Sequence, residues 1–327
     1  MIYVLIFTIG TAGATYFFQH TKESNNAAYI SSNQVITSCV NNVVRLDGYK
    51  LIKPLMFIDN ASESESLNQL KGEVNNIILS FKSQGIISTA SVYLKNFNKN
   101  EWMNINGFEK FSTGSLLKVP TLMAFLKMSE TEPQLLNKKL SFNHEFKTSK
   151  DPKILEKSIQ LGRSYSIKEL LTYMIKYSDN NATSLLNSIL DQKIFDKIFA
   201  DLGIEKPDWT KRTYLINSYD YSKFFRILYN GSYLGLSQSE FALELLSETE
   251  YNNGIIKGIP KNITVAHKFG ESGNQFEKEL HESGIIFLNN SPYIITIMTR
   301  GKDLEKLPEV INQISALTFQ ALSNQSI

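Results

Sequence analysis

The spacing of apolar residues changes twice along this chain, and these changes strongly limit the folds that it can adopt. Apolar residues recur every three or four positions from Glu65 to Ser83, which predicts an amphipathic helix. Alternating segments at 91–95 and 102–105 then predict a strand hairpin, and the middle of the chain returns to helical spacing. Near the C-terminus, further alternating segments precede a last predicted helix at 304–322.

This order predicts an α+β fold, α/β in the broad sense, whose antiparallel sheet is built from both ends of the chain. Helices flank the sheet, and an all-helical subdomain is inserted at about 115–250. A capping box at Ser166–Glu169 predicts where one inserted helix begins. The other predicted elements are helices at 115–128, 182–190, 195–202, 221–229 and 239–247, and strands at 263–269, 284–288 and 293–300.

The N-terminal part of the chain predicts export. Residues 1–20 are nearly all apolar up to Phe18, and the first charged residue is Lys22, so we expect a membrane anchor or a signal peptide. An uncleaved anchor is favoured because the segment lacks a basic start and a clear cleavage site. With either an anchor or a signal peptide, we expect the folded domain in the cell envelope or periplasm or on the outer surface. Residues 21–45 are rich in Ser and Asn, as a tether is, which leaves 46–327 for the folded domain.

Charge and composition exclude several classes of function. The net charge of +2 indicates no nucleic-acid partner. One cysteine and four histidines exclude a disulfide framework and argue against a zinc site. We expect no metal or organic cofactor, a small-molecule substrate, and a monomer.

The first motif whose residues could support catalysis is Ser115-x-x-Lys118. If Ser115 opens a helix, the two side chains share one face, one turn apart. The serine then lies beside free backbone N–H groups, and a partly desolvated lysine can be neutral enough to take the hydroxyl proton. The alternative is an ordinary helix N-cap serine with a solvated lysine.

Two later motifs offer polar groups that could act together with Ser115 and Lys118. Ser178–Asn180 (Ser-Asp-Asn) lies in a polar turn between two helical segments and supplies a hydroxyl, a carboxylate and an amide. Its alternative interpretation is the end of one helix and the cap of the next. Lys268–Gly270 (Lys-Phe-Gly) is expected at the end of a strand, where glycine lets the backbone approach a ligand closely. A plain hairpin turn is the alternative there.

In this order the three motifs resemble those of the penicillin-recognising serine acyltransferases, and especially of class A β-lactamases. The resemblance covers about residues 65–322, including the helical insertion and the last helix. It implies a β-lactamase/transpeptidase-like fold, with 46–327 as the catalytic domain.

The resemblance also implies a role for each motif residue. Ser115 would be the nucleophile, Lys118 its activator, and Ser178 the relay that passes a proton to the leaving nitrogen. Lys268 would keep Lys118 deprotonated and attract a substrate carboxylate. The backbone N–H groups of Ser115 and Glu271 would form an oxyanion hole. Contacts to the substrate are implied for Asn180, Phe269, Gly270 and His281, and a structural role for Asp179.

The chain lacks the usual Ω-loop glutamate of class A enzymes. Those enzymes use the glutamate of a Glu-x-x-Leu-Asn motif to activate the deacylating water, and Thr213 stands at that place in Thr213–Asn217. Threonine cannot act as this base at neutral pH. Glu205 or Asp208 could replace it only if the loop folds differently; otherwise both are solvated carboxylates.

The residues at the positions that bind a substrate carboxylate in class A β-lactamases also differ in this chain. Phe269 replaces a Thr or Ser, and Ser283 stands where an arginine would precede Gly284. His281, on the same strand face as Ser283, or Lys268 could bind the anion instead, although His281 could equally be structural. Glu271 brings a negative charge to the mouth of the site, which disfavours anionic substrates or selects a cationic one.

The leading hypothesis is an exported serine hydrolase of the class A β-lactamase type. Ser115 would be acylated by a β-lactam or a peptidoglycan-like amide, with uncertain deacylation. A D,D-peptidase or penicillin-binding protein is the alternative enzyme, since such proteins hold penicillin as a stable acyl-enzyme. The alternative outside enzymes is a non-catalytic module that binds cell-wall fragments.

Overall fold

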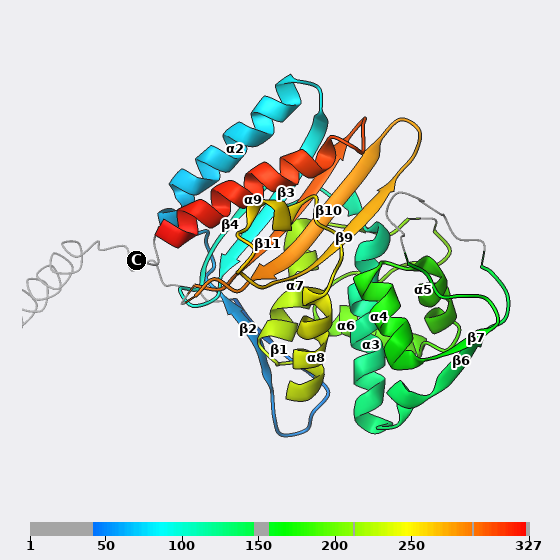
Figure 1. Cartoon of the computed structure of the whole chain (residues 1–327). Helices are drawn as coiled ribbons and strands as arrows, with labels where there is room; N and C mark the ends of the chain where they lie inside the picture. Colours follow the sequence, from blue (N-terminus) through cyan, green and yellow to red (C-terminus); the bar gives the residue numbers. More distant parts are fainter. Residues whose placement is uncertain (1–41, 147–156, 212, 290, 325–327) are drawn as a thin grey trace, which may run out of the picture. The chain divides into compact units, whose positions relative to one another are not determined.

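Five antiparallel strands form the central sheet (Figure 1): β3 (Ile87–Asn96), β4 (Glu101–Ile105), β9 (Val265–Gly273), β10 (Lys278–Ile286) and β11 (Tyr293–Gly301). The computed structural model describes residues 42–146, 157–211, 213–289 and 291–324. The strand order is β4-β3-β11-β10-β9, so β3 from the first half of the chain pairs directly with β11 from the second half. The predicted sheet built from both chain ends is therefore confirmed.

Each face of the sheet is covered by its own apolar layer. Helices α2 (Asn68–Ser83) and α9 (Leu307–Asn324) lie together on one face (Figure 1). Their apolar stripes pack with sheet residues such as Val92 and Ile297 into one buried cluster. Alternate sheet residues, including Tyr93 and Met298, point to the opposite face and join a larger cluster with the inserted helices.

In its described residues, the predicted insertion contains six α-helices: α3 (Lys118–Thr131), α4 (Ile167–Lys176), α5 (Asn180–Asn187), α6 (Gln192–Asp201), α7 (Ser218–Tyr229) and α8 (Leu236–Ser247). The capping box is confirmed, because the Ser166 hydroxyl accepts from the Glu169 N–H and the Glu169 carboxylate accepts from the Ser166 N–H. The insertion is not all-helical as expected. Short strands β6 (Lys139–Phe142) and β7 (Arg163–Ser166) pair within it, too short for their alternation to be recognised.

Strand β9 is longer than expected, and this moves the Lys-Phe-Gly motif. The motif was predicted at a strand end, but β9 pairs with β10 from Val265 to Gly273. Lys268–Gly270 therefore lies inside an edge strand, because Gly270 keeps extended pairing with His281 and does not turn the chain. The helical insertion approaches the sheet along this edge, through the contacts of β9 with α8 and with the turn at Gly114–Leu117.

An N-terminal hairpin is tied to the sheet by a buried ion-pair network. Strands β1 (Asn42–Arg45) and β2 (Leu55–Asp59) pair, so residues that we expected at the end of the tether form a strand. The carboxylate of Asp59 accepts from Lys95 Nζ at 2.8 Å and from Arg226 Nη2 at 2.6 Å. All three side chains are at most 5% exposed, so the network joins the hairpin, the sheet and α7.

The predicted anchor or signal at residues 1–20 lies outside the described residues. Within the described part of the chain, no helix has the length and apolar character to cross a membrane.

Removing the Asp59 carboxylate should destabilise the fold strongly. Asp59→Ala leaves two cations buried without their counter-charge, and we expect the free energy of unfolding to fall by about 3–5 kcal/mol in urea titrations. The control is Asp47→Ala on the same hairpin, whose pair with Lys53 is exposed. That change should leave the free energy of unfolding nearly unchanged, because solvent screens the exposed pair. Equal effects of the two substitutions would contradict the importance of the buried network.

Candidate active site

Ser115 lies in a tight turn that leads directly into helix α3. A 3-10 turn spans Gly114–Leu117, and α3 begins at Lys118. This geometry brings Lys118 Nζ to 3.0 Å from Ser115 Oγ, as the one-turn spacing predicts. The hydroxyl of Tyr221 on α7 donates to the Leu116 carbonyl at 2.9 Å and supports the turn from behind.

The Ser-Asp-Asn segment connects α4 to α5 and contacts Lys118. Lys118 Nζ donates to Ser178 Oγ at 3.0 Å, to Asn180 Oδ1 at 2.8 Å and to the Ser178 carbonyl. Ser178 has φ of 55°, a left-handed conformation that non-glycine residues rarely adopt.

Asp179, for which a structural role was predicted, binds backbone groups on both sides of the Ser-Asp-Asn turn. Its Oδ1 accepts from the Asn181 N–H at 2.9 Å and caps α5, while its Oδ2 accepts from the Ile159 N–H at 2.9 Å. The side chain is 1% exposed and fixes the turn that carries Ser178 and Asn180.

Lys268 reaches the same hydroxyl from the sheet. Its Nζ donates to Ser178 Oγ at 3.0 Å and to the Phe269 carbonyl at 3.0 Å, and the side chain is fully buried. The Ser178 hydroxyl therefore lies between two buried lysines that come from separate layers of the fold. Each of the three predicted motifs contributes to one hydrogen-bonded cluster.

Burial makes Lys118 fit to act as a base. Loss of hydration lowers the pKa of Lys118 to about 7, against a smaller opposing effect of Asp179. The pKa of Lys268 lies well below its usual value, first because of burial and second because of the positive charge of Lys118. We expected Lys268 to be the reason that Lys118 is deprotonated; burial is instead the main cause.

Two glycines hold the Ser115 turn against strand β9. A Cβ on Gly114, whose φ is +48°, would lie 2.0 Å from the Glu271 carbonyl oxygen. A Cβ on Gly270 would lie 2.6 Å from the Thr113 carbonyl oxygen. This close approach brings the backbones of Ser115 and Glu271 together, as an oxyanion hole between them requires. The hole itself stays a prediction.

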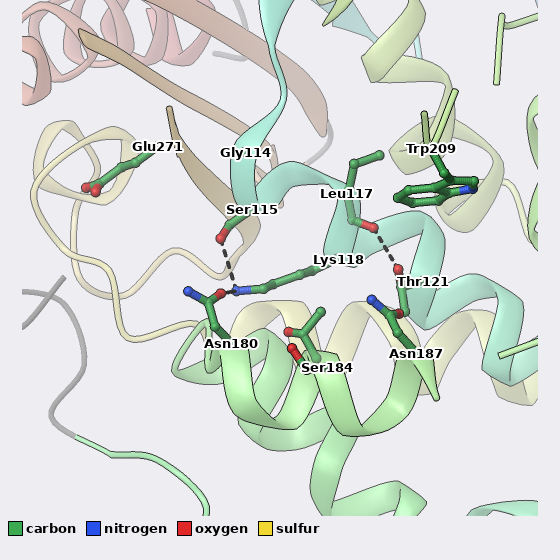
Figure 2. A pocket seen from close by; sticks show the side chains of 11 residues that line it. Gly114, Ser115, Leu117, Lys118, Thr121, Asn180, Ser184, Asn187, Trp209 and Glu271 are labelled. Carbon is green, nitrogen blue, oxygen red and sulfur yellow. Dashed lines mark hydrogen bonds between the residues drawn. The ribbon is translucent and has the colours of Figure 1, made fainter. Parts of the chain in front are cut away.

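A cleft of about 360 Å³ opens at Ser115 (Figure 2). Among the described residues that line it, Lys118 and Glu271 are the ones with ionisable side chains. Trp209 forms part of the wall, although its side chain is 58% exposed. The full lining is Gly114, Ser115, Leu117, Lys118, Thr121, Asn180, Thr183, Ser184, Asn187, Trp209 and Glu271.

Two predicted substrate contacts lie away from the cleft. Phe269 is 4% exposed and stacks on Tyr251, with ring centroids 4.2 Å apart, in the layer under α2 and α9. His281 is fully buried, and its Nε2 lies 3.0 Å from the Ser112 carbonyl oxygen. This contact fits the structural alternative for His281, and neither Phe269 nor His281 lines the cleft at Ser115.

The loop that was expected to hold the deacylating base presents Trp209 to the cleft. Leu215 and Ile216 form strand β8, which pairs with β5 (Phe111–Ser112), and neither residue lines the cleft. Thr213 is exposed and does not line the cleft. The sequence did not predict a role for Trp209, because the pattern around a single tryptophan in a polar loop does not indicate that it lines a cleft.

Neither loop carboxylate that we considered as a replacement base lines the cleft. Glu205 lies 3.8 Å from Lys110, and Asp208 accepts from Thr210 at 2.7 Å. Across the described residues, no group of three or more His, Cys, Asp or Glu side chains is placed to hold a metal ion.

Comparison with known proteins identifies relatives of this chain by sequence. Residues 69–322 match the model of the beta-lactamase enzyme family. The Beta-lactamase VEB-1 of Pseudomonas aeruginosa is 24% identical over 276 residues, which cover 77% of this chain and 92% of that protein. A Beta-lactamase of Proteus vulgaris is 24% identical over 264 residues, covering 75% and 93%.

Solved structures show the same fold. PBP-A has a TM-score of 0.64 at 22% identity, covering 79% of this chain and 97% of its own. A beta-lactamase from Chitinophaga pinensis has a TM-score of 0.66 at 20% identity, covering 78% and 99%. A variant of PBP-A is described as an acyl-enzyme complex with penicillin G.

The lowered pKa of Lys118 can be measured without any substrate. In protein with ¹³C-labelled lysine side chains, we expect one Cε resonance to titrate near pH 7, because burial opposes the charged form. The signal should disappear in Lys118→Ala and persist in Lys127→Ala, which removes a partly exposed lysine of the same helix. Titration of every lysine above pH 9 would contradict this assignment.

Proposed function

Since the chain belongs to the beta-lactamase enzyme family, we propose that it is a serine hydrolase whose Ser115 forms an acyl-enzyme with a β-lactam or a related amide. The contacts of Lys118 carry this proposal. A buried amine of lowered pKa lies within hydrogen-bond distance of a serine hydroxyl on one side and a second serine hydroxyl on the other.

The contacts support one path for the acylation proton. Neutral Lys118 takes the proton of Ser115 Oγ while that oxygen bonds to the substrate carbonyl carbon. The negative charge on the carbonyl oxygen is stabilised by the N–H groups of Ser115 and Glu271. When the C–N bond breaks, Ser178 gives its proton to the leaving nitrogen and regains one from Lys118, 3.0 Å away. Ser115 ends as an ester, and the two lysines keep their original protonation.

Deacylation is expected to be the slow step of this cycle. Water must attack the Ser115 ester, and a base must take its proton. In the described lining of the cleft, Glu271 is the one carboxylate, and Figure 2 shows its side chain directed away from Ser115 Oγ. We therefore propose slow turnover, which favours a penicillin-binding or D,D-peptidase role over efficient lactam destruction.

A non-catalytic binding module is the less supported alternative. Burying two lysines around one hydroxyl costs folding free energy, and a binding module gains nothing from that arrangement. The apolar segment at residues 1–20 supports the further proposal that the chain is exported, where β-lactams and peptidoglycan-like peptides are found.

Intact-protein mass spectrometry tests the acylation. Mixing the protein with benzylpenicillin should add the mass of the drug, and the adduct should persist for hours. Ser115→Ala should show no adduct, while Ser112→Ala, a nearby serine outside the cleft lining, should keep it. Rapid loss of the adduct with hydrolysed drug would contradict slow turnover. No adduct at all would contradict the proposed function.

The fit between β9 and the nucleophile turn should be essential for acylation. Gly270→Ala places a methyl group 2.6 Å from the Thr113 carbonyl oxygen, so strand and turn must separate. We expect acylation by benzylpenicillin to slow by about 100-fold or more, as when an oxyanion donor is lost. The control is Gly72→Ala on helix α2, where a Cβ meets nothing within 4 Å. Unchanged acylation of a folded Gly270→Ala protein would contradict the predicted oxyanion hole.

A further inference from the structure

A histidine and a carboxylate that the proposed mechanism does not use are buried behind the active-site lysine of β9. His267 precedes Lys268 on this strand, so the two side chains lie on opposite faces of the sheet. The Nδ1 of His267 lies 2.6 Å from Oε1 of Glu282 on the adjacent strand β10. Both side chains are fully buried, so the pair joins the two strands on the face away from the cleft.

Glu282 is held in place by the backbone around it. Its Oε2 accepts from the Ile255 N–H at 2.8 Å. A Cβ on Gly254 would lie 1.9 Å from the same oxygen, so the glycine leaves the room that the carboxylate occupies. The Thr249 hydroxyl donates to the His267 carbonyl at 2.8 Å. These contacts fix β9 from the face opposite Lys268.

The hydrogen bonds assign a negative charge to Glu282. One oxygen accepts from the Ile255 N–H and the other lies against the His267 ring, as expected for an ionised carboxylate. Among the described residues, His267 Nε2 has no hydrogen-bond partner. A proton there would be a buried donor without an acceptor, so we assign a neutral ring with its proton on Nδ1. The charge of Glu282 is therefore not cancelled by its partner.

Lys268 needs such a charge nearby. Within the described part of the chain, the printed hydrogen bonds of its Nζ go to two neutral oxygens, Ser178 Oγ and the Phe269 carbonyl, each at 3.0 Å. An ammonium group that is fully buried is costly unless negative charge lies close to it. The cationic form of Lys268 therefore depends on carboxylates that it does not touch directly.

Four groups besides burial bear on this balance. Burial and then the charge of Lys118 lower the pKa of Lys268, while Glu282 and Glu271 raise it. Glu271 is half-buried at the cleft, where solvent screens its charge, whereas Glu282 is fully buried. The field of Glu282 also reaches Tyr251, whose pKa is raised first by burial and then by this carboxylate.

We propose that Glu282 is a positioning residue of the active site: paired with His267, it holds β9 in place and supplies the buried negative charge that favours the cationic form of Lys268. A cationic Lys268 donates more strongly to Ser178 Oγ, which leaves the hydroxyl proton of Ser178 free for the leaving nitrogen. The inference rests on the proposed acylation and adds a residue that acts on it from the far face of the sheet.

Glu282→Gln removes the charge with little change of shape, and the glutamine can still accept from the Ile255 N–H. In full-length protein with ¹³C-labelled lysine side chains, we expect the Cε resonance of Lys268 to titrate at a lower pH than in wild type. The reason is that loss of a nearby negative charge disfavours the ammonium form. The resonance is identified by its absence in Lys268→Arg.

Two controls separate the charge from the structure. Thr249→Val removes the hydroxyl that supports the His267 carbonyl but changes no charge, so it should leave the titration of Lys268 unchanged. Glu309→Gln removes a partly exposed carboxylate of α9, 3.5 Å from Lys257, and should also leave it unchanged. An unchanged Lys268 titration in Glu282→Gln, or an equal shift in Thr249→Val, would overturn the inference.

The pH profile of acylation tests whether this charge matters to the reaction. With benzylpenicillin, the rate in Glu282→Gln should decline on the alkaline side at a lower pH than in wild type, while the acid side, set by Lys118, should not move. An unmoved alkaline side would overturn the positioning role even with a shifted Lys268 resonance. No adduct in wild type would overturn the proposed function and this role with it, whereas the titration would still show whether Glu282 acts on Lys268.

Discussion

The burial of Lys118 is the constraint on which the site depends. An amine removed from water loses its preference for the charged form, which is why its pKa falls to about 7. Burial alone would leave polar hydrogens without partners, so Ser115, Ser178 and Asn180 must all lie within hydrogen-bond distance. The requirement that makes the lysine a base thus also assembles the residues around it.

These partners come from separate layers of the fold. Ser115 lies on the turn before α3, and Lys118 is the first residue of α3. Ser178 lies between α4 and α5, and Lys268 lies on the edge strand β9. The layers meet closely because Gly114 and Gly270 leave no side chain between turn and strand. Any movement of β9 relative to the helices would disturb both the Ser178 contacts and the predicted oxyanion hole.

The arrangement of the cleft fits the proposed acylation better than a deacylation step. Ser115, Lys118 and Ser178, the proposed nucleophile, base and proton relay, lie within hydrogen-bond distance of one another through Lys118, while the loop expected to hold a water-activating carboxylate contributes Trp209. Glu271 supplies charge at the rim, directed away from Ser115 Oγ (Figure 2). The slow turnover that we propose follows from where the carboxylates of this loop and rim lie.

The sequence by itself determined the order of helices and strands and the residues of the three motifs. Periodicity and motif spacing depend on near neighbours, so Ser115, Lys118, Ser178 and Lys268 could be selected without a structure. Long-range packing decided the rest. A buried His281, a Phe269 turned towards Tyr251 and a Trp209 in the cleft wall each depend on residues distant in sequence. Alternation along a strand cannot say which face meets the ligand, because both faces of this sheet are covered.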